Sequence, residues 1–314
     1  MSAGRAIGLL LGVAADGALG HPKSGRPVHR FVQAARALET RTFGDHPLAG
    51  VAHAGVLTGS AVLAGVAAER LGRKGPVYQA ATTAVATWAV LGGAGLAVAG
   101  TGLARDLETG DLASARTTLS GLDPRSTGDL TAIALSRATV EAVAENTADV
   151  VVSPLLWGAV AGVPGLLGSR ALSVLRAMLG KRSARHRRFG WFALRLDEAA
   201  HLLPTRVAAA LTVVGAPVVG GDAGGAWRTW RRDTAVHPSP NAGRVEAAFA
   251  GALEIRLGGR TAYPHGVEEI PVLGDGRNPD AGHVTRAVEL SRVVGWLAGA
   301  TSAVLAIAVG LRRR

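Results

Sequence analysis

The sequence contains no cysteine. Disulfide bonds, thiolate nucleophiles and cysteine-ligated metal or iron–sulfur sites are therefore excluded. Aromatic residues are also scarce, at 4% of 314 residues, although 48% of the chain is hydrophobic. A soluble core of this size normally depends on Phe, Tyr and Trp for buried area. Here Ala, Val, Leu and Gly supply the apolar mass, which is typical of closely packed membrane helices.

Charged residues are missing from three long stretches, 48–68, 75–104 and 293–311. Each is long enough to cross a bilayer at about 1.5 Å per residue, and the second is long enough to tilt or to kink at Gly92–Gly93. Three further apolar stretches, 6–15, 150–169 and 207–221, are short or interrupted by proline and glycine. The stretch 150–169 suits a re-entrant or broken helix. The stretch 6–15 could begin a helix that carries Asp16 inward.

These patterns predict an all-α fold, a polytopic membrane helical bundle with amphipathic or re-entrant helices and no β-sheet core. We expect one integral-membrane domain over residues 1–314. Its polar segments 105–149, 170–206 and 222–292 are expected to form the functional site. The first apolar run follows Arg5 and soon meets Asp16, so no cleavable signal is expected.

The net charge of +11 is carried by basic residues that flank the apolar runs. Basic flanks suit anionic lipid surfaces, and no nucleic-acid-binding motif is present, so we expect a bilayer and no nucleic acid as partner. Residues 170–195 hold eight Lys or Arg and no acid, which predicts a cytoplasmic position. The C-terminal arginines and the basic residues at 70–74 favour the same side. No simple topology satisfies all three groups, so the orientation stays open.

A stripe of acids carries the sharpest signal. Glu141, Glu145 and Asp149 recur every four residues, with Arg137 one turn earlier, so all lie on one face of a predicted helix over 132–149. Like charges at this spacing destabilise an isolated helix by a few tenths of a kcal/mol per pair. The stripe therefore indicates an external cation, and Mg²⁺ with nucleotide phosphates is the natural candidate. The alternative is a solvated helix face with Arg137 as counter-charge.

A second motif surrounds Ser239-Pro240-Asn241. Ser239 suits a helix N-cap, Pro240 suits the first helical position, and Gly258 suits the stop of a helix that ends at Leu257. The basic side chains Arg231, Arg232 and His237 precede this helix start. Free backbone N–H groups beside them would form an anion site for phosphate. A well-capped structural helix is the alternative.

A third motif places Asp197 and His201 one turn apart, between Arg195 and Arg206. A charge in the centre of a membrane helix costs about 2.5–3.5 kcal/mol, so such groups often mark function. The alternative is a juxtamembrane anchor in which Asp197 pairs with an arginine. His53, inside an apolar stretch, is expected to be packed or hydrogen-bonded. The chain holds no G-x-x-x-x-G-K-[ST], H-E-x-x-H or G-x-S-x-G motif.

From about Asp16 to Gly274 the chain resembles the CobD/CbiB family, the adenosylcobinamide-phosphate synthases. The Glu-Asn-Thr-x-Asp and Ser-Pro-Asn-x-x-x-x-Glu pieces, in this order, are the specific part. The residues that carry the resemblance are Val140, Glu141, residues 143–147, Asp149, Arg195, Leu196, Asp197, Leu203, Pro204, Arg206, Arg232, Asp233, residues 239–241, Glu246, residues 250–253, residues 257–259 and Tyr263.

The resemblance implies an ATP-dependent ligase of cobalamin biosynthesis in the cell membrane. Such an enzyme joins a propionate of adenosylcobyric acid, a corrinoid, to aminopropanol or aminopropanol phosphate, through an acyl phosphate, with ATP and Mg²⁺ as cofactors. It implies catalytic roles for Glu141, Glu145, Asp149 and Asp197, with Glu141 and Glu145 also as metal ligands. It implies substrate-binding roles for Asp16, Asn146, Arg195, Arg232, Asp233, Ser239, Asn241 and Glu246. Assembly into a homo-oligomer is left open.

The chain departs from the family pattern at several polar positions. Arg125-Ser126-Thr127 stands where the pattern has Arg-Asp-Thr, Arg176 stands where it has an acid, and His201 stands where it has asparagine. We expect a carboxylate within salt-bridge reach of Arg176, with Glu198 and Glu145 as candidates. These departures keep two other functions open: a catalytically silent paralogue that scaffolds or regulates a membrane pathway, and a small transporter.

Overall fold

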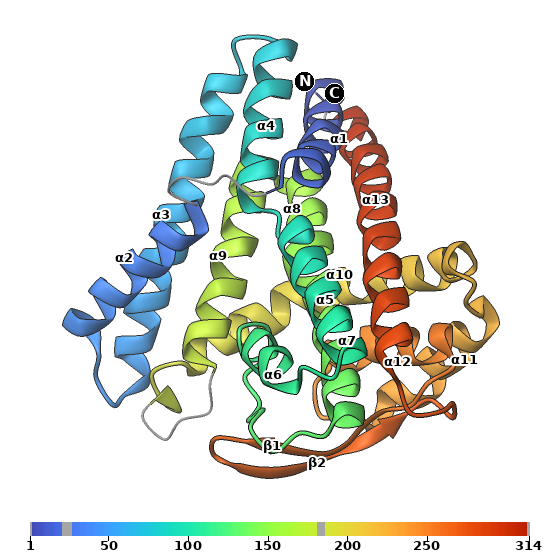
Figure 1. Ribbon diagram of the computed structural model, residues 1–314. Helices are drawn as coiled ribbons and strands as arrows, with labels where there is room; N and C mark the ends of the chain where they lie inside the picture. Colours follow the sequence, from blue (N-terminus) through green and yellow to red (C-terminus); the bar gives the residue numbers. More distant parts are fainter. Residues whose placement is uncertain (1, 21–26, 181–185, 313–314) are drawn as a thin grey trace. The chain divides into compact units, whose positions relative to one another are not determined.

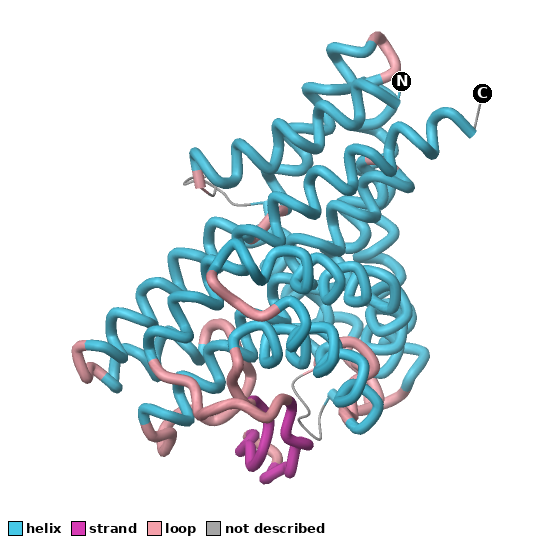
Figure 2. Tube along the Cα trace, turned by 90° about the vertical axis from the view of Figure 1, so that its right-hand side faces the viewer, coloured by secondary structure: helices cyan, strands magenta, loops and turns pink. Residues whose placement is uncertain are grey.

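The computed structural model describes residues 2–20, 27–180 and 186–312. The chain forms two compact units, unit 1 (residues 1–94, 149–201 and 298–314) and unit 2 (residues 95–148 and 202–297). Helix predominates throughout the described chain, and strand is confined to one hairpin (Figure 2). The expected all-α membrane bundle is thus confirmed.

Five helical stretches are long and apolar enough to cross a membrane (Figure 1). They are α1 (Ser2–Leu19), α3 (Pro47–Gly72), α4 with α5 (Pro76–Val90 and Gly93–Glu108), α10 with a following 3-10 turn (Trp191–Gly215 and Ala216–Val219), and α13 (Ala281–Arg312). All three predicted spans are among them, and the second breaks at Leu91–Gly92, beside the expected glycine pair. The helix around 207–221 begins earlier than expected because Pro204 lies inside α10 without ending it.

Unit 1 is built by close approach of small residues. Helix α1 packs on α4, where a Cβ added to Gly12 would collide with the side chain of Thr87. Helix α3 packs on α9 (Val163–Leu179), and a Cβ on Gly65 would lie 2.6 Å from Cα of Pro164. Close packing of this kind is how helices associate without a hydrophobic driving force.

The apolar stretch 150–169 is broken, as predicted. Helix α8 (Ser153–Ala161) stops at Gly162, whose φ of 71° is open to glycine, and α9 follows at once. The freed N–H of Val163 donates to Glu69 Oε2 (2.9 Å), and Glu69 also pairs with Arg5 at 2.7 Å. This half-buried ion pair therefore satisfies the backbone N–H at the break.

Helix α2 (Pro27–Thr42) covers part of α3, and Thr42 Oγ1 lies 2.9 Å from Nδ1 of His53. His53 is fully buried against the ring of Phe189. The expectation that His53 is packed and hydrogen-bonded is confirmed.

Unit 2 combines α5, α6 (Leu112–Ser120), α7 (Ala132–Thr147), α11 (Ala223–Asp233), α12 (Ala242–Leu253) and the start of α13. Thr131 caps α7 by accepting the N–H of Ala134 (3.3 Å). A π-helical turn, Ala148–Val152, follows Thr147. The α-helix therefore ends before Asp149, so the four-residue spacing no longer predicts that Asp149 lies on the same face as Glu141 and Glu145.

The start of α12 lies two residues later than predicted, because the helix begins at Ala242 with Asn241 rather than Ser239 as its N-cap, and its end also differs. Ser239 Oγ accepts the N–H groups of Asn241 (3.3 Å) and Ala242 (3.1 Å). The helix ends at Leu253 rather than at Leu257, because Glu254 adopts a left-handed conformation (φ 56°) and donates its cap N–H to Ala250.

An antiparallel hairpin, β1 (Leu257–Tyr263) and β2 (Gly266–Leu273), was not predicted. It pairs Leu257 with Leu273 at its base and Tyr263 with Gly266 at its turn. The two glycines at 258 and 259 create a register shift near the base. The hairpin places the amide N–H of Gly258 next to α7.

Candidate functional site

The centre of the polar cluster in unit 2 is Arg125. Its guanidinium contacts Glu141 Oε2 at 2.6 Å and Asp123 Oδ2 at 2.8 Å. The three side chains are only 5–8% exposed. Burial disfavours the charge of Arg125, but the two carboxylates outweigh it and raise the pKa of Arg125. The ion triplet is therefore a fully charged, buried structure.

Glu141 uses both of its carboxylate oxygens in this arrangement. Oε2 accepts from Arg125, and Oε1 accepts the N–H of Gly258 at 2.6 Å. Arg137 donates instead to the carbonyl of Arg260 at 3.1 Å. The interpretation of a solvated helix face with Arg137 as counter-charge is wrong for Glu141, since the charge is buried and its partner is Arg125.

Glu246, on α12, faces the same cluster. It is 8% exposed. Burial, reinforced by the charges of Glu141 and Glu145, raises the pKa of Glu246 well above its ordinary value, and Arg125 offsets only part of this. A carboxyl group of this kind holds its proton into the pH range where proton transfer to and from substrates is useful.

His237 is the polar neighbour of Glu246. Its Nδ1 lies 3.1 Å from the backbone nitrogen and 3.2 Å from the carbonyl oxygen of Ser239, and its Nε2 lies 3.5 Å from Glu246 Oε2. Burial lowers the pKa of His237, which keeps the imidazole neutral. Burial also raises the pKa of Tyr263 to about 12, so its phenol remains a hydrogen-bond donor.

The expected phosphate-binding arginine is already paired. Arg232 contacts Asp233 at 2.5 Å and also Asp275. Burial opposes ionisation of Asp233, but hydrogen bonds from Arg232 and from the N–H of Gly274 (2.8 Å) outweigh it and lower the pKa of Asp233. Arg232 lines a cleft of about 660 Å³ between α11 and α12. Arg232 is thus paired with two aspartates and also borders the cleft.

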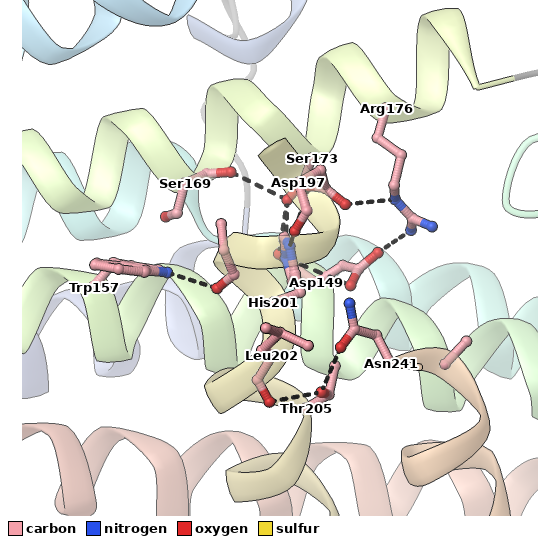
Figure 3. A network of polar contacts seen from close by, with 12 residues as sticks. Asp149, Trp157, Ser169, Ser173, Arg176, Asp197, His201, Leu202, Thr205 and Asn241 are labelled. Atoms are coloured by element: carbon pink, nitrogen blue, oxygen red, sulfur yellow. Dashed lines mark hydrogen bonds and ion pairs between the residues drawn. The ribbon is translucent and has the colours of Figure 1, made fainter. Parts of the chain in front are cut away.

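Two further predicted residues of unit 2 make hydrogen bonds within that unit. Asn241 Oδ1 accepts from Thr205 Oγ1 at 3.3 Å (Figure 3). Asn146 Nδ2 donates to the carbonyl of Ala142 at 2.8 Å. Ser239 Oγ accepts two backbone N–H groups at the start of α12, as described above. The substrate-binding roles expected for the three residues stay predictions.

A second polar cluster lies in unit 1, where Arg176 bridges two buried aspartates (Figure 3). Its guanidinium contacts Asp149, and its Nε lies 3.2 Å from Asp197 Oδ2. His201 lies between the same acids, with Nδ1 3.1 Å from Asp197 Oδ1 and Nε2 3.6 Å from Asp149 Oδ1. Ser173 Oγ approaches His201 Nε2 at 3.4 Å. The cluster thus brings two acids together with two basic side chains.

The expectation of a carboxylate beside Arg176 is confirmed by Asp149 and Asp197, which both contact its guanidinium. Glu198 pairs with Arg195 at 2.7 Å on an exposed part of α10. Asp197 is 3% exposed and pairs with an arginine as the anchor interpretation requires.

Asp16 points inward from α1, as expected, and is 5% exposed. Its Oδ2 accepts the N–H of Ala94 at 3.0 Å, at the start of α5. The charge of Arg170, on α9, interacts with those of Asp149 and Asp16. Asp16 thus belongs to unit 1 together with Asp149 and Asp197.

The structure therefore groups the predicted residues by unit. Unit 2 holds Glu141, Glu145, Asn146, Arg232, Asp233, Ser239, Asn241 and Glu246, and unit 1 holds Asp16, Asp149, Arg195 and Asp197. Convergence of all of them on one cavity stays a prediction. Sequence reasoning missed Asp123 and Arg125 as site residues. The only signal for them was two charges in a polar segment, with no periodicity to show a shared face.

A magnesium site fits poorly with these contacts. Among the described residues, no group of three or more His, Asp or Glu side chains is arranged to hold a metal ion. Glu141, one of the two expected ligands, is bonded through both oxygens to Arg125 and Gly258. Glu141 therefore does not fit the role of a magnesium ligand.

Comparison with known proteins gives a consistent assignment. The family model described as "CobD/Cbib protein" matches residues 9–291. The chain is 52% identical over 311 residues to "Cobalamin biosynthesis protein CobD" of Mycobacterium tuberculosis, covering 99% of this chain and 97% of that protein. It is 34% identical over 313 residues to the protein of the same name from Chromobacterium violaceum, covering 97% and 96%. No solved structure matches the chain significantly. The chain therefore belongs to the CobD/CbiB family of cobalamin biosynthesis proteins, and five of its helical stretches are long and apolar enough to cross a membrane.

Proposed function

We propose that this multi-pass protein of the cell membrane catalyses ATP-dependent amide formation. Its substrates would be a propionate side chain of adenosylcobyric acid and the amine of aminopropanol or aminopropanol phosphate. Family membership supports the pathway, and the buried carboxyl of Glu246 supports the reaction type. ATP, with Mg²⁺ carried on its phosphates, is the proposed cofactor.

The reaction has two balanced steps. The propionate oxygen bonds to the γ-phosphorus of ATP, which gives an acyl phosphate and ADP. The amine nitrogen then bonds to the acyl carbon, phosphate leaves, and the nitrogen loses a proton. A free amine is protonated at neutral pH, so the enzyme must accept protons from it before or during attack.

Glu246 is the residue that we assign to this proton transfer. Its carboxyl is surrounded by acids, so a substrate ammonium would be attracted to it and would favour its ionised form. His237 Nε2, 3.5 Å away, stabilises this carboxylate when it carries the ring proton. Glu141, on α7, accepts from Arg125 and from the N–H of Gly258 in β1, and these two bonds hold α7 and β1 beside the cluster.

The test is conversion by the purified full-length protein. Adenosylcobyric acid, ATP and magnesium are incubated with each amine, and the amide product and ADP are followed by mass spectrometry. We expect product with at least one amine. Glu246→Gln should lower kcat by about 10²–10⁴, the usual contribution of a general acid–base group.

Glu269→Gln is the matched control, because Glu269 is an exposed carboxylate on β2. It should turn over like the unaltered protein. Absence of product with both amines would refute the proposed reaction. Full activity of Glu246→Gln would refute the role of Glu246 alone.

A catalytically silent member that scaffolds or regulates the pathway is the second candidate. One observation favours it: Arg176 contacts both Asp149 and Asp197, two of the acids for which catalytic roles are expected. The same incubation separates the two candidates, since a silent member forms neither amide nor ADP while still folding.

A further inference from the structure

Helix α11 has two chemically different faces. Its buried face, which includes Gly225 and Thr229, packs on α12, and a Cβ added to Gly251 of α12 would collide with the carbonyl of Gly225. This glycine contact fixes how α11 is turned. Trp227, Trp230 and Arg231 follow at spacings of three and four residues, so they share the outward face. Trp227 is 46% exposed.

The outward face carries a hollow of about 340 Å³. Its lining consists of Trp227, Trp230, Arg231, Thr234, Ala235 and Arg244. The two indole rings meet edge to face, with centres 5.3 Å apart, and the guanidinium of Arg231 lies 5.4 Å from the centre of the Trp227 ring. The hollow thus combines two cations with two aromatic rings, and none of its lining residues is acidic.

The cations of this hollow lack the acidic partners that their neighbours have. Arg228 pairs with Asp222 at 3.2 Å, and Arg232 pairs with Asp233. For Arg231 and Arg244, by contrast, the described part of the chain offers no carboxylate within ion-pair distance. Burial and the nearby charge of Arg206 lower the pKa of Arg244. An anion bound here would relieve this repulsion.

The position of α11 in the chain favours a membrane lipid as the anion. The helix begins at Ala223, just after the candidate span that ends at Val219. Arg286, near the start of α13, donates to the carbonyls of Val219 (3.3 Å) and Gly220 (2.9 Å). α11 therefore stands where two candidate spans end. Tryptophan is enriched at that depth of a membrane, and arginine binds anionic lipid there.

We propose that the hollow formed by Trp227, Trp230, Arg231 and Arg244 binds the phosphate headgroup of an anionic phospholipid. The guanidinium groups contact the phosphate, and the indole rings contact the glycerol and upper acyl region. Neither Glu246 nor the residues of the Arg125 ion triplet line this hollow, and its function is to hold α11 at the membrane surface.

The test is calorimetric titration of the full-length protein in neutral detergent with dihexanoyl-phosphatidylglycerol. We expect saturable binding. The double variant R231Q/R244Q should bind about 25-fold more weakly, which is about fivefold for each arginine and corresponds to about 1 kcal/mol per basic residue at an anionic surface. R228Q is the matched control, because Arg228 lies on the same helix but is paired with Asp222. It should bind as the unaltered protein does.

Dihexanoyl-phosphatidylcholine, inorganic phosphate and ATP are titrated in parallel, and each should bind more weakly than phosphatidylglycerol. W227F, which keeps a ring in the hollow, provides a second variant should the double variant fail to fold, as judged by circular dichroism. It should weaken binding of phosphatidylglycerol. Three results would overturn the proposal: no saturable binding of phosphatidylglycerol, equal losses in R228Q and R231Q/R244Q, or equal or tighter binding of inorganic phosphate or ATP at the same arginines.

Discussion

Replacement of Arg125 by methionine tests the ion triplet that organises unit 2. Methionine has a similar length and no charge, so Glu141 and Asp123 would stay buried without their cation. Removing one partner of a buried ion pair typically destabilises a protein by about 3–5 kcal/mol, because an uncompensated charge remains. The side chains are at most 8% exposed, so solvent screening reduces this value little.

Thermal unfolding of the purified protein in detergent measures the effect. A loss of 1 kcal/mol lowers Tm by about 2–4 °C in domains of about 150–250 residues, so Arg125→Met should lower Tm by about 6–20 °C. The double variant Arg125→Met/Glu141→Gln should recover part of this loss, because the neutral amide introduced by the second substitution leaves no buried charge at that position and can still accept from Gly258.

Arg228→Met is the matched control in the same unit. Arg228 also pairs with an aspartate, but the two side chains are 72% and 43% exposed, and an exposed pair contributes about 0–1 kcal/mol. Equal shifts in Tm for Arg125→Met and Arg228→Met would refute the argument from burial. Failure of Glu141→Gln to restore any stability would show that Arg125 acts through packing rather than charge.

Three single substitutions test other parts of the structure. The folded protein holds a proton on Glu246 that the unfolded chain releases above about pH 4.5, so stability should fall as pH rises from there, by at most about 1.4 kcal/mol per pH unit. Glu246→Gln should remove this slope between about pH 5 and 8, and an unchanged slope would contradict the assignment. Arg176→Asp should lower Tm, because the introduced aspartate lies beside Asp149 and Asp197 without the cation that Arg176 supplies. Magnesium should then raise Tm more in this variant than in the unaltered protein, and an equal effect of magnesium in both would exclude a latent cation site. Glu254→Gly should stabilise the protein by about 1 kcal/mol, because Glu254 has φ 56°, and a lower Tm would show that its side chain matters more than its backbone.

Membrane spans were predictable because the signal is local and additive. Each of the stretches 48–68, 75–104 and 293–311 lacks charge over a length that only a membrane or a large core could bury. Local spacing also predicted real contacts: Asp197 and His201, one turn apart, are 3.1 Å from each other. Helical periodicity thus fixes neighbours within one element.

Contacts between distant segments were not predictable in the same way. Arg125 meets Glu141 from a segment without regular structure, and the choice between Arg125 and Arg137 depends on how that segment folds back. The hairpin was missed because β1 is rich in glycine and lacks a clear alternation. The end of α12 was missed because Glu254, not a glycine, adopts the left-handed conformation.

Charge balance distinguishes the chemical roles of the two clusters. In unit 1, Asp149 and Asp197 both contact Arg176, and His201 lies against the same two acids, so these acids are engaged by basic side chains. In unit 2, the charges of Glu141, Glu145 and Asp123 all raise the pKa of Glu246, and the charge of Arg125 lowers it. Negative charges close to a buried carboxyl group are unfavourable, and such arrangements are concentrated at functional sites. A substrate ammonium is a group of the right sign to offset these charges. The electrostatics therefore place amine recognition and proton transfer at Glu246 in our proposal, and give Asp149 and Asp197 the role of holding helices α9 and α10 together within unit 1.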